Sequence, residues 1–246
     1  RTMPYRKTSF EQGRPFHIIS RAIEGRKIFE REEDCYRFIL QVFAASVGKP
    51  AFNLWKKDTT KVADSLLQGE DPSAKFVIRE HPPLVNILDF SLVMNHYHFH
   101  LLPSGEKAMP LFMKKLNGGF AKYFNLKYQR KGFLFASRYQ SVSVKTEAQL
   151  NAVSRYITII NPLDIYQPGW REDGLKNKEG ALNFLGNYQF SSFPDRVGKR
   201  KSKILAPKEI LEEYFSEDNM NKNGYLQFVK DFLEERFSPN RALFLE

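Results

Sequence analysis

The sequence has little cysteine and little tryptophan: one Cys, at position 35, and two Trp among 246 residues. A single cysteine excludes an internal disulfide framework and is typical of proteins from a reducing compartment. Long apolar runs are absent, and the chain does not open with a basic segment followed by an apolar one. We therefore expect a cytoplasmic protein with no membrane partner.

Acidic residues are few relative to basic ones. The 38 Lys and Arg outnumber the 28 Asp and Glu, which gives a formal net charge of +10. A basic surface favours polyanions, because each phosphate that it neutralises releases counterions. Composition alone fits an ordinary basic surface equally well. The 22 Phe and 11 Tyr supply rings for a core, and a few of them could stack on unpaired bases.

Hydrophobic periodicity predicts strands and helices in alternation over the first two thirds of the chain. The order is strand, helix, strand, strand, helix, strand, helix, at residues 15–20, 31–47, 85–93, 96–102, 112–124, 141–145 and 146–161. Thr146 is a good N-cap for the last helix, with Gln149 three residues later. This order predicts an α+β fold: a ferredoxin-like antiparallel sheet with helices on one face, plus a C-terminal helical extension.

Two parts of the chain break this pattern. Residues 48–83 are mostly polar and rich in Gly and Pro, and we interpret them as an excursion inserted between core elements. Residues 166–246 contain Gly- and Pro-rich turns and two helical stretches, near 207–216 and 223–237. We therefore predict one domain at 10–165, interrupted by the excursion, and a partly helical C-terminal extension at 166–246.

The strongest local signal is His96-Tyr97-His98-Phe99-His100. Alternate residues of a strand share a face, so the three histidines point one way and the two other rings point the opposite way. Histidines two residues apart are separated by roughly 6.8 Å, and those four apart by roughly 13.6 Å. His96 and His98 are therefore the pair that can share a divalent ion, with His100 a bystander or an outer group. Packed or surface histidines without a metal are the other interpretation.

Tyr156 is the candidate nucleophile. Leu150, Val153 and Ile157 line the core face of its helix, and Tyr156 neighbours that face, from which its hydroxyl could point into a cleft. A tyrosine becomes a useful nucleophile toward phosphorus when a metal polarises the phosphate. An ordinary tyrosine at the edge of the core fits the same pattern.

Taken together, the motifs resemble those of the single-tyrosine HUH transposases, insertion-sequence-200-like proteins and relatives of the REP-associated tyrosine transposases. The matching segments follow the family's order: Gly13–Arg21, Ile28-Phe29 with Asp34 and Phe38, Met94–His98 with Leu101-Leu102, Gly132–Phe135 with Arg138-Tyr139, Arg155–Ile157 with Asn161-Pro162, and Phe190–Phe193. The resemblance covers roughly residues 10–200 and leaves out the excursion.

This resemblance implies a ferredoxin-like domain that cuts and rejoins DNA with a divalent metal ion, Mg²⁺ or Mn²⁺. His96 and His98 match the family's metal ligands, and Tyr156 matches its nucleophile. The tyrosine would leave a free 3′-hydroxyl and hold the 5′ end as a phosphotyrosine. Members act on single-stranded or hairpin DNA, commonly as homodimers, so DNA and a second copy of the chain are the implied partners. A bacterial member would be associated with the nucleoid.

One position departs from the family pattern. Relatives place a polar residue, often Asn or Gln, one helical turn after the tyrosine as a further metal ligand. This chain has Ile160 there, and Asn161 follows one residue later. A bulge in the helix would return Asn161 to the site; otherwise the ligand is lost or replaced by water. Two rival functions stay open: a domesticated, non-catalytic DNA- or RNA-binding protein, and a phosphodiesterase that uses activated water.

Basic side chains near these motifs are the candidate DNA contacts, and they are Arg138, Lys114, Lys115, Lys122, Arg130 and Lys131. They could follow a phosphate backbone while Tyr123, Tyr128 or Phe133 stacks on bases. Arg138 has the better case, because it lies inside a matched motif. A solvated helical face explains the lysines equally well.

Overall fold

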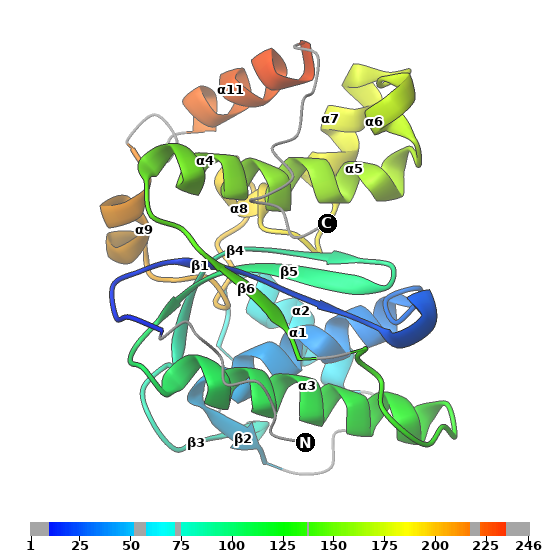
Figure 1. The fold of residues 1–246 in the computed structure, drawn as a ribbon, viewed down its shortest axis with the longest axis vertical. Coiled ribbons are helices and arrows are strands. Elements are labelled where there is room, and N and C mark those ends of the chain that lie inside the picture. Colours follow the sequence, from blue (N-terminus) through cyan, green and yellow to red (C-terminus); the bar gives the residue numbers. More distant parts are fainter. Residues whose placement is uncertain (1–9, 52–57, 72–74, 137, 217–221, 235–246) are drawn as a thin grey trace, which may run out of the picture.

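The computed structural model describes residues 10–51, 58–71, 75–136, 138–216 and 222–234 (Figure 1). Its centre is a four-stranded antiparallel sheet with the strand order β4-β5-β1-β6. The strands are β1 (Phe16–Arg21), β4 (Val85–Val93), β5 (His96–Pro103) and β6 (Gln140–Ser143). Helix α1 (Glu32–Val47) connects β1 toward β4, and α3 (Ala108–Lys127) connects β5 to β6. The predicted α+β, ferredoxin-like arrangement is confirmed.

Side chains of β5 alternate between two layers. Tyr97 and Phe99 pack against Phe38 of α1, with ring centroids 4.8 and 6.3 Å away. This layer contains α1 and α3, the two helices of the ferredoxin-like core. His98 faces the other layer, where its ring contacts Tyr156. A strand that is buried on both faces thus carries apolar rings on one side and histidines on the other.

One long helical run covers the histidine face of the sheet (Figure 1). It consists of α4 (Glu147–Arg155), the π-helical segment η3 (Tyr156–Ile160) and α5 (Asn161–Tyr166). The Thr146 hydroxyl caps its start by accepting from the Gln149 N–H at 3.2 Å, as predicted. The sheet therefore lies between α1 and α3 on one side and this run on the other. The predicted placement of helices on one face is wrong, because a second hydrophobic core packs α4, η3 and α5 against the other face.

The excursion at 48–83 has structure of its own in its described residues. Strands β2 (Gly48–Pro50) and β3 (Val77–Arg79) form a separate antiparallel pair, and α2 (Asp58–Leu67) lies between them in the chain. Its apolar side chains, Leu66 among them, join the core beneath α1. A short 3-10 turn, η1 (Ile23–Gly25), follows β1. The excursion is therefore packed against the core, on the side away from the histidines (Figure 1).

The C-terminal part contains α6 (Trp170–Asp173), α7 (Lys178–Asn187), α8 (Phe193–Arg196), α9 (Lys208–Tyr214) and α11 (Lys222–Glu234). The last two occupy the predicted helical stretches, whose final residues, 235–237, lie outside the described part. The first three form where the sequence analysis predicted turns. Helix α7 begins with an N-cap: the side-chain oxygen of Asn177 accepts from the N–H of Gly180, three residues later.

A second hydrophobic core joins this part to the sheet. It contains Leu88 of β4, Val153 of α4, Leu185 of α7 and Val229 of α11, all fully buried. This core includes residues from both sides of the predicted domain boundary at 165. The boundary itself stays a prediction. Among the described helices, none combines the length and the apolar character that crossing a bilayer requires.

Candidate active site: histidines, tyrosine and the π segment

The two candidate metal ligands lie next to each other on β5. The ring centroids of His96 and His98 are 4.9 Å apart, and the His98 ring is fully buried. His96 begins the strand opposite Arg21, while His98 pairs with Ile19 of β1 and Ser91 of β4. Both rings lie on the sheet face covered by the tyrosine helix, as strand alternation predicts.

Hydrogen bonds define how each ring can act. The carboxamide oxygen of Asn95 only accepts, so the His96 Nδ1 donates to it at 2.6 Å and the His96 Nε2 keeps a lone pair. The His98 Nδ1 lies 2.9 Å from the Nε2 of His17, and the buried Nε2 of His98 has no hydrogen-bond partner. A ring nitrogen with a free lone pair, on a ring whose second nitrogen is held by a neighbour, is the arrangement of metal-binding histidines.

Both rings are uncharged at neutral pH. Burial lowers the pKa of His96 to about 3, and the positive charges of Arg21 and Arg171 add to this effect. Burial also lowers the pKa of His98 well below its ordinary value, with further contributions from His96 and His17. A neutral imidazole is the form that binds a metal ion.

Tyr156 lies against these histidines within one chain. Its ring centroid is 5.4 Å from that of His98 and 5.9 Å from that of His17, both in edge-to-face geometry. The guanidinium of Arg171 lies over the same ring, 5.5 Å from its centroid. The candidate nucleophile and the two candidate histidine ligands are 58 or more residues apart in the chain, and the sheet and α4 bring them together.

The helix carrying Tyr156 contains the bulge that the position of Asn161 suggested. Residues Tyr156–Ile160 form a π-helical turn, in which the Asn161 N–H donates to the Tyr156 carbonyl oxygen. Asn161 therefore lies one turn after Tyr156, where relatives carry their polar residue. Its side chain is buried, and its Nδ2 has no hydrogen-bond partner. A half-turn of the carboxamide exchanges that nitrogen for the oxygen that a metal ion requires.

His17 is a site residue that the sequence analysis missed. It is fully buried on β1, bonded to His98 and in ring contact with Tyr156. A signal was present, since His17 stands between Phe16 and Ile18 in the apolar first part of the strand. Its side chain lies where the metal-binding and nucleophilic candidates meet.

His100 belongs to a different polar cluster on the same face. Its Nδ1 is 3.6 Å from the carboxylate of Asp89, which accepts from the Arg196 Nε at 2.9 Å. Burial by itself would raise the pKa of Asp89. The charge and hydrogen bonds of Arg196 and His100 together outweigh burial, so the pKa of Asp89 is below its ordinary value. Arg196 also covers the Phe215 ring at 3.6 Å. This cluster ties α8 to β4, which fits a structural role for His100.

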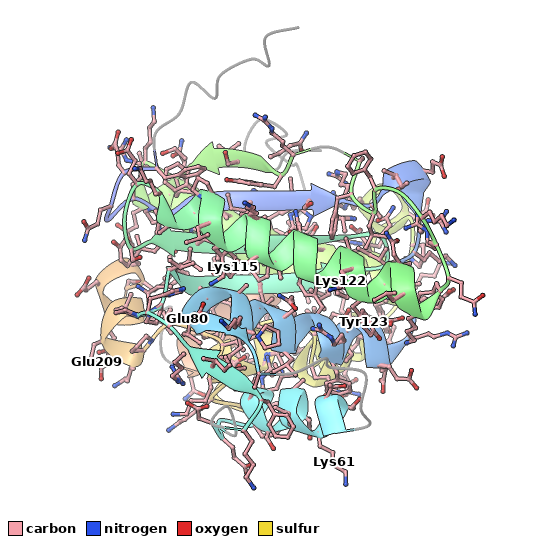
Figure 2. All side chains as sticks on the ribbon, turned by 90° about the horizontal axis from the view of Figure 1, so that it is seen from below. Lys61, Glu80, Lys115, Lys122, Tyr123 and Glu209 are labelled. Carbon is pink, nitrogen blue, oxygen red and sulfur yellow. The ribbon has the colours of Figure 1, made fainter. Side chains whose placement is uncertain are left out.

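Helix α3, which carries the three predicted DNA-contacting lysines, lies on the sheet face opposite His98, and Figure 2 labels Lys115 and Lys122 on it. Lys114 and Lys122 are exposed there, while Lys115 is half-buried and pairs with Glu80 at 3.6 Å. The sheet separates them from Tyr156. Their contact with DNA stays a prediction, and any strand that they hold would pass along a different side of the protein from the reacting phosphate.

The other predicted contacts lie between α3 and β6, near the end of β1. Lys131 and Arg138 are exposed, and Arg130 donates to Asn125 and to the carbonyl of Phe133. Phe133 is 86% exposed. An exposed ring among basic side chains is typical of a surface for unpaired bases.

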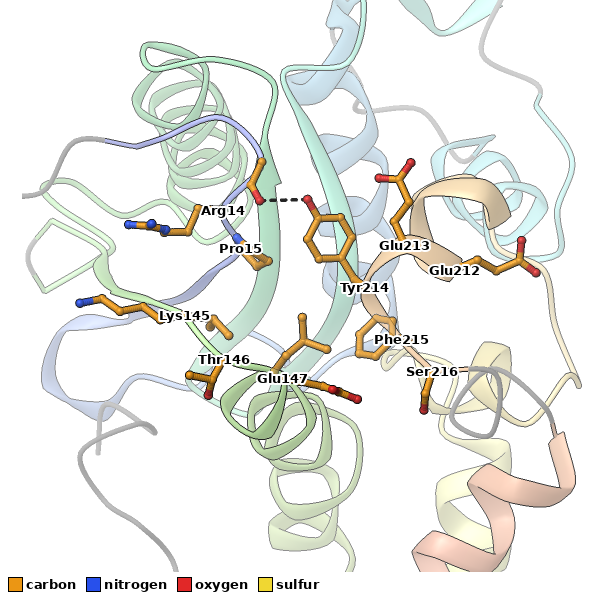
Figure 3. Close-up of a pocket in the computed structure, with 13 residues that line it drawn as sticks. Arg14, Pro15, Lys145, Thr146, Glu147, Glu212, Glu213, Tyr214, Phe215 and Ser216 are labelled. Carbon is orange, nitrogen blue, oxygen red and sulfur yellow. Dashed lines mark hydrogen bonds between the residues drawn. The ribbon is translucent and has the colours of Figure 1, made fainter.

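The site is closed to solvent at its tyrosine. Tyr156 and His98 are fully buried, so a phosphate reaches them only after side chains move. An open pocket of about 510 Å³ lies instead at the other end of the run, at the start of α4 (Figure 3). The pocket is lined by two basic residues, Arg14 and Lys145, and by two acidic residues, Glu212 and Glu213. Such mixed charge does not select a phosphate.

A metal ion at His96 and His98 would need further ligands. Over the described ranges, His, Cys, Asp and Glu form no group of three or more that could hold a metal ion. Asn161 is the buried polar candidate on the tyrosine helix whose amide nitrogen has no hydrogen-bond partner, and oxygen atoms of a phosphate could fill the remaining positions. The lone nitrogens of the two neutral histidines fit a divalent ion that keeps open positions for substrate.

Comparison with known proteins gives a family match over part of the chain. Residues 81–159 match the IS200-like transposase family. This confirms the resemblance over a segment that contains both histidines and Tyr156. No curated protein matches the sequence. The chain is also similar to the solved structure of a REP-associated tyrosine transposase bound to a REP hairpin, at 14% identity and a TM-score of 0.46, over 84% of this chain and 93% of that one.

Proposed function

We propose, from the match of residues 81–159 to the IS200-like transposases, that this protein is a transposase that cuts and rejoins single-stranded or hairpin DNA through Tyr156. The observation that carries the proposal is the ring contact between Tyr156 and His98, 5.4 Å between centroids, inside one chain. A tyrosine in contact with His98, whose Nε2 has no partner and whose ring contacts His96, suits attack on a metal-bound phosphate.

In the proposed reaction, the Tyr156 hydroxyl oxygen bonds to the phosphorus as the bond from phosphorus to the 3′-oxygen breaks. The phenol loses one proton and the departing 3′-oxygen gains one, so the step leaves a 3′-hydroxyl and a 5′-phosphotyrosine. The reverse attack by a 3′-hydroxyl rejoins the strand without an external energy source. A Mg²⁺ or Mn²⁺ ion held by His96, His98 and Asn161 would polarise and orient the phosphate.

The π turn weighs against a domesticated, non-catalytic binding protein. That alternative drew its support from Ile160 at the position of the third ligand. The π turn brings Asn161 to one turn after Tyr156, so a polar residue stands at that turn and this support for the alternative is weaker. Single π turns inside α-helices occur frequently at functional sites and are rare elsewhere.

The experiment is adduct formation with labelled single-stranded oligonucleotides that carry hairpins, in Mn²⁺, resolved on a denaturing gel. We expect a covalent protein–DNA species in the wild type and none in Tyr156→Phe. Tyr166→Phe, in the same helical run, is the matched control and should retain the adduct. The proposal fails if the wild type forms no adduct across the hairpin panel.

The products separate the two rivals. A phosphodiesterase would release free 5′-phosphate ends and tolerate Tyr156→Phe. A pure binding protein would retain oligonucleotides but show no Mn²⁺ affinity that depends on His96, which calorimetry of wild type and His96→Ala would detect.

A further inference from the structure

Arg171 is the charged side chain that lies over the candidate nucleophile. It belongs to α6, beyond the segment that matches the family, and its guanidinium carbon is 5.5 Å from the centroid of the Tyr156 ring. Its side chain is 18% exposed, whereas Tyr156 is fully buried. Arg171 thus lies between the tyrosine and the solvent.

Asp164 fixes the orientation of this arginine. The Arg171 Nε donates to one carboxylate oxygen of Asp164 at 3.0 Å, and the Nη2 donates to the other at 2.5 Å. The indole N–H of Trp170 donates to the same carboxylate at 2.9 Å, with the ring buried in the core. A two-point bond of this kind restrains the guanidinium plane, and the anchored neighbour restrains α6.

The positive charge of Arg171 also reaches the histidines. It contributes to the low pKa of both His96 and His98, although burial is the larger cause in each case. One fixed cation therefore acts on the nucleophile and on both candidate ligands. A phosphate placed for attack by Tyr156, and within reach of those ligands, would lie in the field of this cation.

Resting on the proposed function, we infer that Arg171 contacts a non-bridging oxygen of the phosphate that Tyr156 attacks, with Asp164 as its positioning residue. When DNA enters, the guanidinium stays paired with Asp164 and donates to the phosphate. It stabilises the negative charge that the phosphate carries while the bond to the 3′-oxygen breaks. It takes no part in proton transfer.

A binding measurement tests the contact without any chemistry. In a Tyr156→Phe background, the affinity for a single-stranded oligonucleotide is measured against salt concentration. Loss of one phosphate contact should reduce the slope of log K against log salt by about 0.7 in Arg171→Ala. An unchanged slope overturns the inference, whether or not the protein cuts DNA.

The rate of adduct formation tests the role in cleavage. We expect Arg171→Ala to slow it on the order of 10- to 100-fold, and Arg171→Lys to slow it less. Replacing the charged scissile phosphate by a methylphosphonate should shrink the difference between wild type and Arg171→Ala in the isomer that lacks the contacted oxygen. If Arg171 only covers Tyr156, the alanine variant will form adduct at the wild-type rate or faster, and the inference is wrong.

Arg79 provides a matched control. It pairs with Asp71 at 2.6 Å and lies over the Phe43 ring at 5.2 Å, as Arg171 does with Asp164 and Tyr156. It lies in β3, on the other side of the sheet. Arg79→Ala should keep both the salt slope and the adduct rate. Melting temperatures of both variants identify any loss that comes from misfolding, and wild type without adduct would count against the proposed function alone.

Discussion

The backbone N–H of Asn161 donates to the carbonyl oxygen of Tyr156, five residues earlier. An α-helix would have placed Ile160 in that relation to the tyrosine, and would have turned Asn161 away by about one residue's rotation. The extra residue in the turn therefore decides which side chain shares a face with the nucleophile. The π turn thus places Asn161, and not Ile160, one turn after Tyr156.

Removing the extra residue should preserve the site. Deleting Ile160 converts the π turn to an α-helical turn and leaves the asparagine four residues after Tyr156, still one turn away. We expect the deletion to keep Mn²⁺ affinity within a few-fold, at some cost in stability because a buried side chain is lost. Asn161→Ala should weaken the affinity. Calorimetry would contradict the idea if the deletion and the alanine variant lost affinity equally.

His17 should orient His98 toward the metal. In His17→Ala the His98 Nδ1 loses the partner at 2.9 Å, and the ring can rotate. Loss of such a supporting hydrogen bond typically costs about 10- to 100-fold in metal affinity. His100→Ala is the matched control, because His100 is equally buried and pairs with His17 across the strands. It should lose stability and keep Mn²⁺ affinity; equal affinity losses in both variants would rule out a specific role for His17.

Phe133 should stack on an unpaired base. Its loop is held firmly: the Ile23 N–H donates to the Leu134 carbonyl, and Asn125 donates to the Gly132 carbonyl. Phe133→Ala should weaken binding of oligo-dT by about 1–3 kcal/mol, and Phe133→Trp should keep it. Ile78→Ala, which removes another exposed apolar side chain, is the control. Fluorescence anisotropy that gives equal affinities for Phe133→Ala and the control would refute the stacking.

Acid should destabilise the metal-free protein through the two histidines. Their pKa values are lower in the folded protein, about 3 for His96 and well below the ordinary value for His98, so below about pH 6.5 the unfolded chain binds more protons. The free energy of unfolding should fall as pH falls from 6.5 toward 4, by at most about 1.4 kcal/mol per pH unit for each histidine.

Urea unfolding in EDTA at several pH values measures this slope. In the double variant His96→Gln/His98→Gln the free energy of unfolding should depend less on pH over the same range, because glutamine does not titrate there. Asp89 contributes separately and only at lower pH, because its pKa is below the ordinary value. A slope that is the same in wild type and in the double variant would contradict the assignment.

Local patterns in the sequence were sufficient for the strands of the four-stranded sheet, for helices α1, α3 and α4, and for the two faces of β5. Side-chain direction in a strand depends only on parity, so the separation of His98 from Phe99 follows from position alone. The N-cap at Thr146 and the one-residue offset of Asn161 from the expected ligand position are likewise local, and the sequence alone predicts the cap and shows the offset. The three helices α6, α7 and α8 were missed because they are short and lie among Gly and Pro residues, which mask hydrophobic periodicity.

Contacts between distant segments depended on the tertiary structure. The sequence determined that this chain carries a histidine strand, a tyrosine helix and an asparagine one residue out of step, because each is a property of a few neighbouring residues. Only the packed fold decided that Tyr156 lies against His98, that His17 supports that histidine and that Arg171 covers the tyrosine. Those contacts arise when two hydrophobic cores fix the sheet and the helices relative to each other, and no local pattern encodes that placement.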